Sequence, residues 1–260
     1  MNYNPMWVES TEFISKKDLE TLHALSEKYK LSKLLNSPRN IDELGLDFIY
    51  SSAQIEGNTY DKFETKELIQ LGITTAGKKY SDATMILNMR KAYETILNPI
   101  NVETVDFIKD LHFELSNLLV NENERGTVRR ESVLIGGSEY KPLDNPGQLN
   151  EELKYLVKQM GEIKDPFVKA IYAHLNICYL QYFMDCNKRT ARFYQNAILV
   201  SQGITPLLFR DKVVDGYVQS VITYYETGKH EEYIKWFIKA YEDFINRFNS
   251  DGPILPSRIF

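Results

Sequence analysis

The chain has 260 residues, of which 43% are hydrophobic and 26% charged, as in an ordinary globular protein of one domain with small extensions. Its formal net charge of -5 gives no general attraction to nucleic acid, so no nucleic-acid partner is expected. Two cysteines do not make a disulfide framework, and no apolar run reaches the roughly 18 residues of a membrane span, so we expect a cytoplasmic protein without membrane contact.

Apolar residues recur at helical spacing through most of the chain, which predicts a mainly α fold. The expected helices cover residues 15–35, 42–54, 62–71, 81–97, 102–120, 148–160, 165–180, 188–201, 211–226 and 230–248. An extended arm over 1–14 and the first helices form an expected N-terminal helical extension over 1–50. A turn is predicted at 36–39, and an irregular tail that contains two prolines is predicted over 249–260.

Glu56 lies where the second expected helix ends, and a negative charge there opposes the helix dipole. Gly57 follows it and suits the left-handed residue that ends many helices. The Glu56 carboxylate therefore either points into water or has a basic partner elsewhere in the chain. The local sequence leaves both options open.

Residues 124–142 are the one stretch with β character, and they predict a hairpin that turns at Gly136-Gly137. The residues that favour strands are Val128, Val133, Leu134, Ile135 and Tyr140. Because an isolated two-stranded ribbon is only marginally stable, this hairpin must rest on the helical body.

The stretch 181–192 places polar and charged side chains between two apolar helices. Backbone N–H groups at the start of the second helix favour an anion, and Arg189 and Arg192 share one face of that helix. Asp185 offers a hard carboxylate oxygen for a divalent metal. These are the parts of a phosphate–Mg²⁺ site. The alternative is a solvated helix start that Asp185 or Asn187 caps, with its cations at the surface.

Two histidines near these regions are predicted to be structural. His174 precedes Gln181 by two helical turns, or about 10 Å. Direct proton transfer needs a distance of about 3 Å, so His174 cannot serve position 181 as a base. His112, within an expected helix, is predicted to be a packed or capping residue.

The stretch 181–192 resembles the signature of the Fic (Fido) family, H-x-F-x-D/E-G-N-G/K-R-x-x-R. The matching residues are Phe183, Asp185, Asn187, Lys188, Arg189 and Arg192. Gln181 stands where the family has its catalytic His, and Cys186 stands where it usually has Gly or Ala. A Gln amide cannot accept a proton at neutral pH. Cys186 also lacks the access to positive φ that Gly has.

The resemblance implies a Fic-fold helical bundle over 51–248, with the hairpin at 124–142 as a small flap. Fic-type chemistry transfers AMP from ATP to a protein hydroxyl, so the resemblance implies ATP with Mg²⁺ and a protein target of unknown identity. Asp185 would hold the metal. The residues that would bind the nucleotide are Asn187, Lys188, Arg189 and Arg192.

Two further matches extend the resemblance. Residues 51–58 are similar to the end of the family's inhibitory helix, and Glu56 would then pair with Arg192 and block the γ-phosphate. The 124–142 stretch shares Gly126, Arg129, Val133, Ile135 and Gly136 with the family's flap. The edge of that flap, here Val133, Leu134 and Ile135, would align a target segment by strand addition.

Three functions stay open on the sequence alone. The first is a nucleotide-binding Fic protein whose AMP transfer is impaired or lost because Gln181 replaces the base. The second is an active but atypical transferase of AMP or phosphate, because Cys186-Asn-Lys-Arg is close to the loop of Doc-like members. The third is a helical interaction protein without catalysis. The oligomeric state is also open, with a homodimer among the options.

Overall fold

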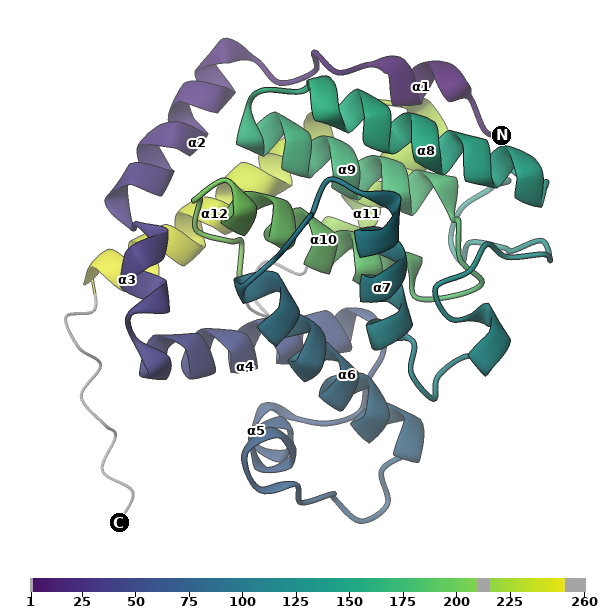
Figure 1. Ribbon diagram of the computed structural model, residues 1–260. Helices are drawn as coiled ribbons and strands as arrows, with labels where there is room; N and C mark the ends of the chain where they lie inside the picture. The colour runs from purple at the N-terminus through teal and green to yellow at the C-terminus, as the bar shows by residue number, and fades with distance from the viewer. Residues whose placement is uncertain (1, 210–215, 251–260) are drawn as a thin grey trace, which may run out of the picture.

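The computed structural model describes residues 2–209 and 216–250, and it is built around two consecutive helices (Figure 1). These are α9 (Pro166–Leu180) and α10 (Asn187–Ser201), and nearly all of their residues are buried. Such complete burial explains why α9 is apolar on all sides rather than along one stripe. The loop between the two helices is the stretch that the sequence marked as an anion site.

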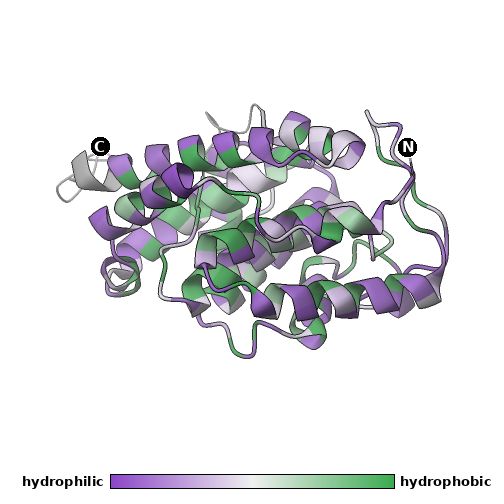
Figure 2. Cartoon of the chain, turned by 90° about the horizontal axis from the view of Figure 1, so that it is seen from above, coloured by the Kyte–Doolittle hydropathy of each residue, from purple (hydrophilic) through white to green (hydrophobic). Residues whose placement is uncertain are grey.

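The remaining helices surround this pair, and the predicted mainly α fold is confirmed. In chain order they are α1 (Pro5–Glu9), α2 (Lys16–Lys28), α3 (Leu31–Leu35), α4 (Pro38–Ile55), α5 (Lys62–Leu71), α6 (Tyr80–Leu97), α7 (Val105–Leu115), the 3-10 turn η1 (Glu122–Glu124), α8 (Pro146–Glu162), α11 (Tyr217–Thr227) and α12 (Glu231–Ser250). Figure 2 shows hydrophilic and hydrophobic residues alternating along the outer helices, as expected of helices that bury one side. Among the described residues, no helix has the length and hydropathy needed to cross a membrane.

The N-terminal elements differ from the prediction because local caps begin helices that the apolar spacing did not indicate. Asn4 accepts a hydrogen bond from the Met6 N–H and starts α1 within the expected extended arm. Ser37 accepts from the Asn40 N–H, and Pro38 occupies the first position of α4. The predicted turn at 36–39 is therefore the start of α4. The single helix predicted over 15–35 is divided into α2 and α3.

Three other predicted bounds change. α7 begins after its cap Thr104 and ends at Leu115, so it is shorter than the predicted helix at both ends. Residues 210–215, in which the predicted helix 211–226 begins, lie outside the described residues, and α11 is described from Tyr217. α12 continues to Ser250, and the rest of the predicted tail also lies outside the described residues.

The predicted β-hairpin at 124–142 is wrong. The described residues contain no strand, and this stretch takes part only in an isolated parallel bridge between Asn2 and Lys141. The turn at Gly136-Gly137 is present, with Gly137 at φ 79°. Instead of a ladder, the backbone N–H of Arg129 donates to the carbonyl of Tyr182, at 3.0 Å. The stretch therefore rests on the loop between α9 and α10, which we call the motif loop (residues 181–186).

His174 is a buried structural residue, as predicted. Its Nε2 lies 3.2 Å from the Tyr217 hydroxyl, and its ring stacks on Tyr233 with 4.7 Å between centroids. Burial, helped by the positive charge of Arg192, lowers the pKa of His174 to about 3. The imidazole is therefore neutral in the folded protein at physiological pH.

We expect acid to destabilise the fold through His174. The unfolded chain protonates this imidazole below about pH 6.5, whereas the folded chain does so only near pH 3. Its contribution to the free energy of unfolding is complete above pH 6.5 and is lost as the pH falls toward 3. One pKa unit corresponds to about 1.4 kcal/mol. Urea unfolding should therefore show that, between pH 7 and pH 4, the free energy of unfolding falls by about 3 kcal/mol less in His174→Gln than in the wild type. Parallel pH profiles for the two proteins would contradict this.

Candidate functional site

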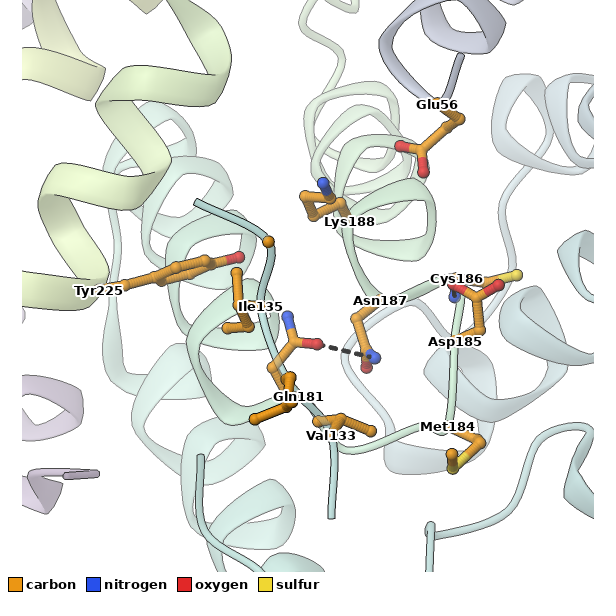
Figure 3. Close-up of a pocket in the computed structure, with 12 residues that line it drawn as sticks. Glu56, Val133, Ile135, Gln181, Met184, Asp185, Cys186, Asn187, Lys188 and Tyr225 are labelled. Atoms are coloured by element: carbon orange, nitrogen blue, oxygen red, sulfur yellow. Dashed lines mark hydrogen bonds between the residues drawn. The ribbon is translucent and has the colours of Figure 1, made fainter. Parts of the chain in front are cut away.

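A cleft of about 200 Å³ opens at the N-terminus of α10 (Figure 3). It is lined by Glu56, Val133, Leu134, Ile135, Gly136, Gln181, Met184, Asp185, Cys186, Asn187, Lys188 and Tyr225. The structure thus brings together three regions that the sequence singled out separately: the end of α4, the Gly136 turn and the motif loop. Tyr225, from α11, was not identified, because nothing local in its sequence marks it.

The motif loop has an unusual backbone, which the first residue of α10 helps to hold in place. Gln181 and Cys186 both adopt left-handed conformations, at φ 49° and 61°, although neither is glycine. Such residues need support from their surroundings. The Asn187 amide supplies it, accepting from the Phe183 N–H at 2.9 Å and donating to the Phe183 carbonyl at 2.8 Å. At Cys186 itself the backbone N–H donates to Asp185 Oδ1 at 2.5 Å.

Gln181 lies at the end of α9 with its amide facing Asn187 (Figure 3). Its Nε2 donates to the Cys178 carbonyl at 2.6 Å, and its Oε1 accepts from Asn187 Nδ2 at 3.2 Å. The side chain is thus oriented at the cleft wall. It can donate and accept hydrogen bonds there, but it cannot take up a proton at neutral pH.

The two arginines of α10 are buried rather than solvated, which excludes the surface-cation alternative for them. Arg192 Nη2 donates to Glu56 Oε1 at 2.8 Å, and its Nη1 donates to the Tyr217 hydroxyl at 3.3 Å. Arg189 Nε lies 3.7 Å from the other Glu56 oxygen. Neither arginine lines the cleft, because the Glu56 carboxylate lies against both.

Glu56 is the carboxylate that the local sequence left with two options, and it points to the arginines rather than into water. Burial opposes its ionisation, but nearby positive charges, Arg192 foremost, hold the pKa of Glu56 below the ordinary value. Glu56 is therefore an anion bound at the arginine pair. Without Glu56, Arg192 would be a buried cation that has lost its carboxylate partner.

The end of α4 that carries Glu56 is fastened to the start of α6. Asn58 Nδ2 donates to the Asp82 carbonyl at 2.9 Å, and the Thr59 hydroxyl donates to the Asp82 carboxylate at 2.6 Å. Gly57 takes φ 77°, so that the chain turns sharply into this anchor. The position of the Glu56 backbone is thus fixed independently of its ion pair.

Asp185 presents a carboxylate to the cleft with 61% of its side chain exposed. One of its oxygens accepts from Arg189 Nη2 at 3.2 Å. The part of the chain that the structure describes holds no group of three or more metal-ligating side chains. A single carboxylate suits Mg²⁺, which binds to one or two carboxylates together with phosphate and water, and it does not suit a closed zinc site.

The 124–142 stretch covers the cleft, and Arg129, whose side chain is fully buried, is one of the residues that hold it there. The guanidinium donates to the carbonyls of Gln181 and Glu131, at 2.7 Å each, and also to the carbonyl of Leu143. Leu134, at the tip, is 93% exposed. The sequence matched Arg129 to a pattern but gave no role for it, since its partners are up to 52 residues away.

Comparison with known proteins relates the chain to one family. Residues 102–199 match the model of the Fic/DOC family. The chain is 26% identical over 255 residues to the "Protein adenylyltransferase Fic" of Nematostella vectensis, covering 94% of this chain and 59% of that protein. It is 30% identical over 202 residues to the protein of the same name from Drosophila persimilis, covering 75% of this chain and 37% of that protein. The chain therefore spans about half the length of the adenylyltransferases it matches.

Solved structures show the same fold. A Fic family protein from Desulfovibrio desulfuricans superimposes with a TM-score of 0.79 at 17% identity, over 98% of this chain and 79% of that chain. Fic-1 from C. elegans superimposes with a TM-score of 0.75 at 23% identity, over 90% of this chain and 71% of that chain.

Proposed function

Because the chain contains a Fic (Fido) domain, we propose that it binds ATP with Mg²⁺ in the cleft at α10, as a module of the adenylyltransferase type whose transfer step is limited by Gln181. The observation that carries this proposal is the anion already bound at the arginine pair, the Glu56 carboxylate. A site that holds one carboxylate between two arginines at a helix N-terminus is suited to phosphate.

Different residues of the cleft would bind different parts of the nucleotide. The N–H groups at the start of α10, together with Asn187 and Lys188, face the space for phosphate oxygens. Arg189 and Arg192 become available to the outer phosphates once Glu56 moves away. Asp185 would hold Mg²⁺, which when bound neutralises phosphate charge.

The chemistry needs a proton acceptor beside the target hydroxyl. In AMP transfer, the oxygen of a target hydroxyl attacks the α-phosphorus, the bond to the bridging oxygen breaks, and pyrophosphate leaves. The hydroxyl proton must pass to a base, and position 181 offers only a neutral amide. Loss of a general base typically lowers the rate by about 10²–10⁴-fold. The exposed tip at Leu134 is the proposed contact for the target segment.

We expect Glu56→Gly to raise the affinity for ATP–Mg²⁺ by about tenfold or more, which corresponds to at least 1.4 kcal/mol. The reason is that the phosphate no longer competes with a carboxylate for Arg192. Isothermal titration calorimetry on the wild type and the variant measures the change. The control is Glu122→Gly, which replaces an exposed glutamate that does not line the cleft. This variant should bind ATP–Mg²⁺ as the wild type does. If neither the wild type nor Glu56→Gly binds ATP, the nucleotide function is wrong and an interaction protein is favoured.

A further inference from the structure

We propose that His112 is a positioning residue, which fixes the main chain of Asp185 against the start of the 124–142 stretch and so orients the Asp185 carboxylate toward the cleft. The inference rests on the proposed function only in assigning Asp185 to Mg²⁺. Its structural basis is a fully buried imidazole on α7 that contacts both the motif loop and the start of the 124–142 stretch.

Both ring nitrogens of His112 are engaged. The Gly126 N–H donates to Nδ1 at 2.9 Å, so Nδ1 carries no proton. The proton is therefore on Nε2, which lies 3.2 Å from the Asp185 carbonyl oxygen and donates to it. The partners are 14 residues and 73 residues away in sequence, so the ring joins two segments that no strand pairing connects.

The orientation of the ring is also fixed. His112 stacks on Phe183 with 3.7 Å between centroids and 4° between planes. Phe183 is itself held by the Asn187 amide, so the imidazole rests on the rigid part of the motif loop. On the other side, Gly126 adopts φ 67°, and a Cβ there would lie 3.0 Å from the Lys109 carbonyl oxygen. Only a residue without a side chain lets the chain approach α7 closely enough to present its N–H.

The Asp185 side chain needs such support. It is 61% exposed, and its oxygens accept from Arg189 Nη2 at 3.2 Å and from the Cys186 N–H at 2.5 Å. Both contacts are made from the main-chain position of Asp185, and the hydrogen bond from His112 holds the carbonyl of that main chain against the buried α7. Residues that orient a metal ligand from behind typically change metal affinity by about 10–100-fold when they are replaced.

The test compares two replacements in the Glu56→Gly protein. In His112→Gln the terminal amide can reach the place of Nε2 and donate to the Asp185 carbonyl. In His112→Asn the shorter amide can only replace Nδ1, so the contact with Asp185 is lost. We expect His112→Asn to lose about 10–100-fold of the Mg²⁺-dependent ATP affinity, with ATP binding in EDTA unchanged, and we expect the same of Asp185→Asn. His112→Gln should retain most of the Mg²⁺ effect.

A second measurement needs no nucleotide. Hydrogen exchange at the Phe183 and Cys186 amides, which donate to Asn187 Oδ1 and Asp185 Oδ1, should be at least tenfold faster in His112→Asn, with exchange in the middle of α9 unchanged. Unchanged exchange at these amides overturns the proposal, whatever the ATP result. A full Mg²⁺ effect in His112→Asn also overturns it and leaves His112 as a packing residue. Failure of the proposed function is separate, because then the Glu56→Gly parent binds no ATP with or without Mg²⁺.

Discussion

Gln181→His in the Glu56→Gly background is expected to raise the transfer of label from α-labelled ATP to protein by about 10²–10⁴-fold. Position 181 already has the backbone that such a residue needs, since its left-handed conformation turns the side chain toward Asn187 and the cleft. An imidazole there replaces a neutral amide with a group that takes up a proton near neutral pH. The readout is label on the protein itself or on proteins of a cell lysate.

The control for this experiment is Gln202→His in the same background, which places the same new imidazole at an exposed position after α10. It should label no better than the parent. If the Gln181→His protein binds ATP but transfers no label, then the missing base at position 181 is not what prevents transfer. Cys186 and Lys188 are the next candidates, and Cys186→Gly tests the first of them. Label from γ-labelled rather than α-labelled ATP would favour phosphate transfer, as in Doc-like members.

Arg129→Ala is expected to lower the free energy of unfolding by about 3–5 kcal/mol, because it leaves several backbone carbonyls without donors. The buried guanidinium bonds to the carbonyls of Gln181, Glu131 and Leu143. A buried acceptor that loses its partner costs about 1–3 kcal/mol. Urea unfolding of the variant measures the loss.

The neighbouring Arg130 provides the matched control, because its side chain is exposed. Arg130→Ala should change the free energy of unfolding by no more than about 0.5 kcal/mol. A loss below 1 kcal/mol in Arg129→Ala would mean that water replaces the guanidinium at these carbonyls. In that case the 124–142 stretch is held by its other contacts.

The sequence predicts the helices best where local signals decide them. α5 matches the expected helix 62–71, and its cap Asp61 forms a complete capping box with Glu64. α9 and α10 match the long buried runs on either side of the motif loop. The hairpin prediction was wrong because Val133 and Ile135 indicate only a preference for extended backbone. Pairing depends on a partner strand, and Arg129 gives this stretch a different partner.

The candidate site was visible in sequence only in part. The charged residues of the stretch 181–192 mark it as a candidate site in the sequence. The contact between Glu56 and Arg192 joins residues 136 apart, so it could be inferred only from the family resemblance. The place of Tyr225 and the contacts of His112 depend wholly on how the helices pack. No spacing rule within one segment can indicate them.

The anchor that joins Asn58 and Thr59 to Asp82 has a consequence for the speed of nucleotide entry. Since the end of α4 is tied to α6, exchange of the Glu56 carboxylate for a phosphate requires rotation about the bonds of one side chain, with the helix in place. Collective helix motions take microseconds to milliseconds, and rotations of single side chains are faster. If nucleotide binds here as proposed, we expect its association to be limited by diffusion and by the ion pairs that Glu56 makes with Arg189 and Arg192. It should follow single-exponential kinetics without a slow opening phase.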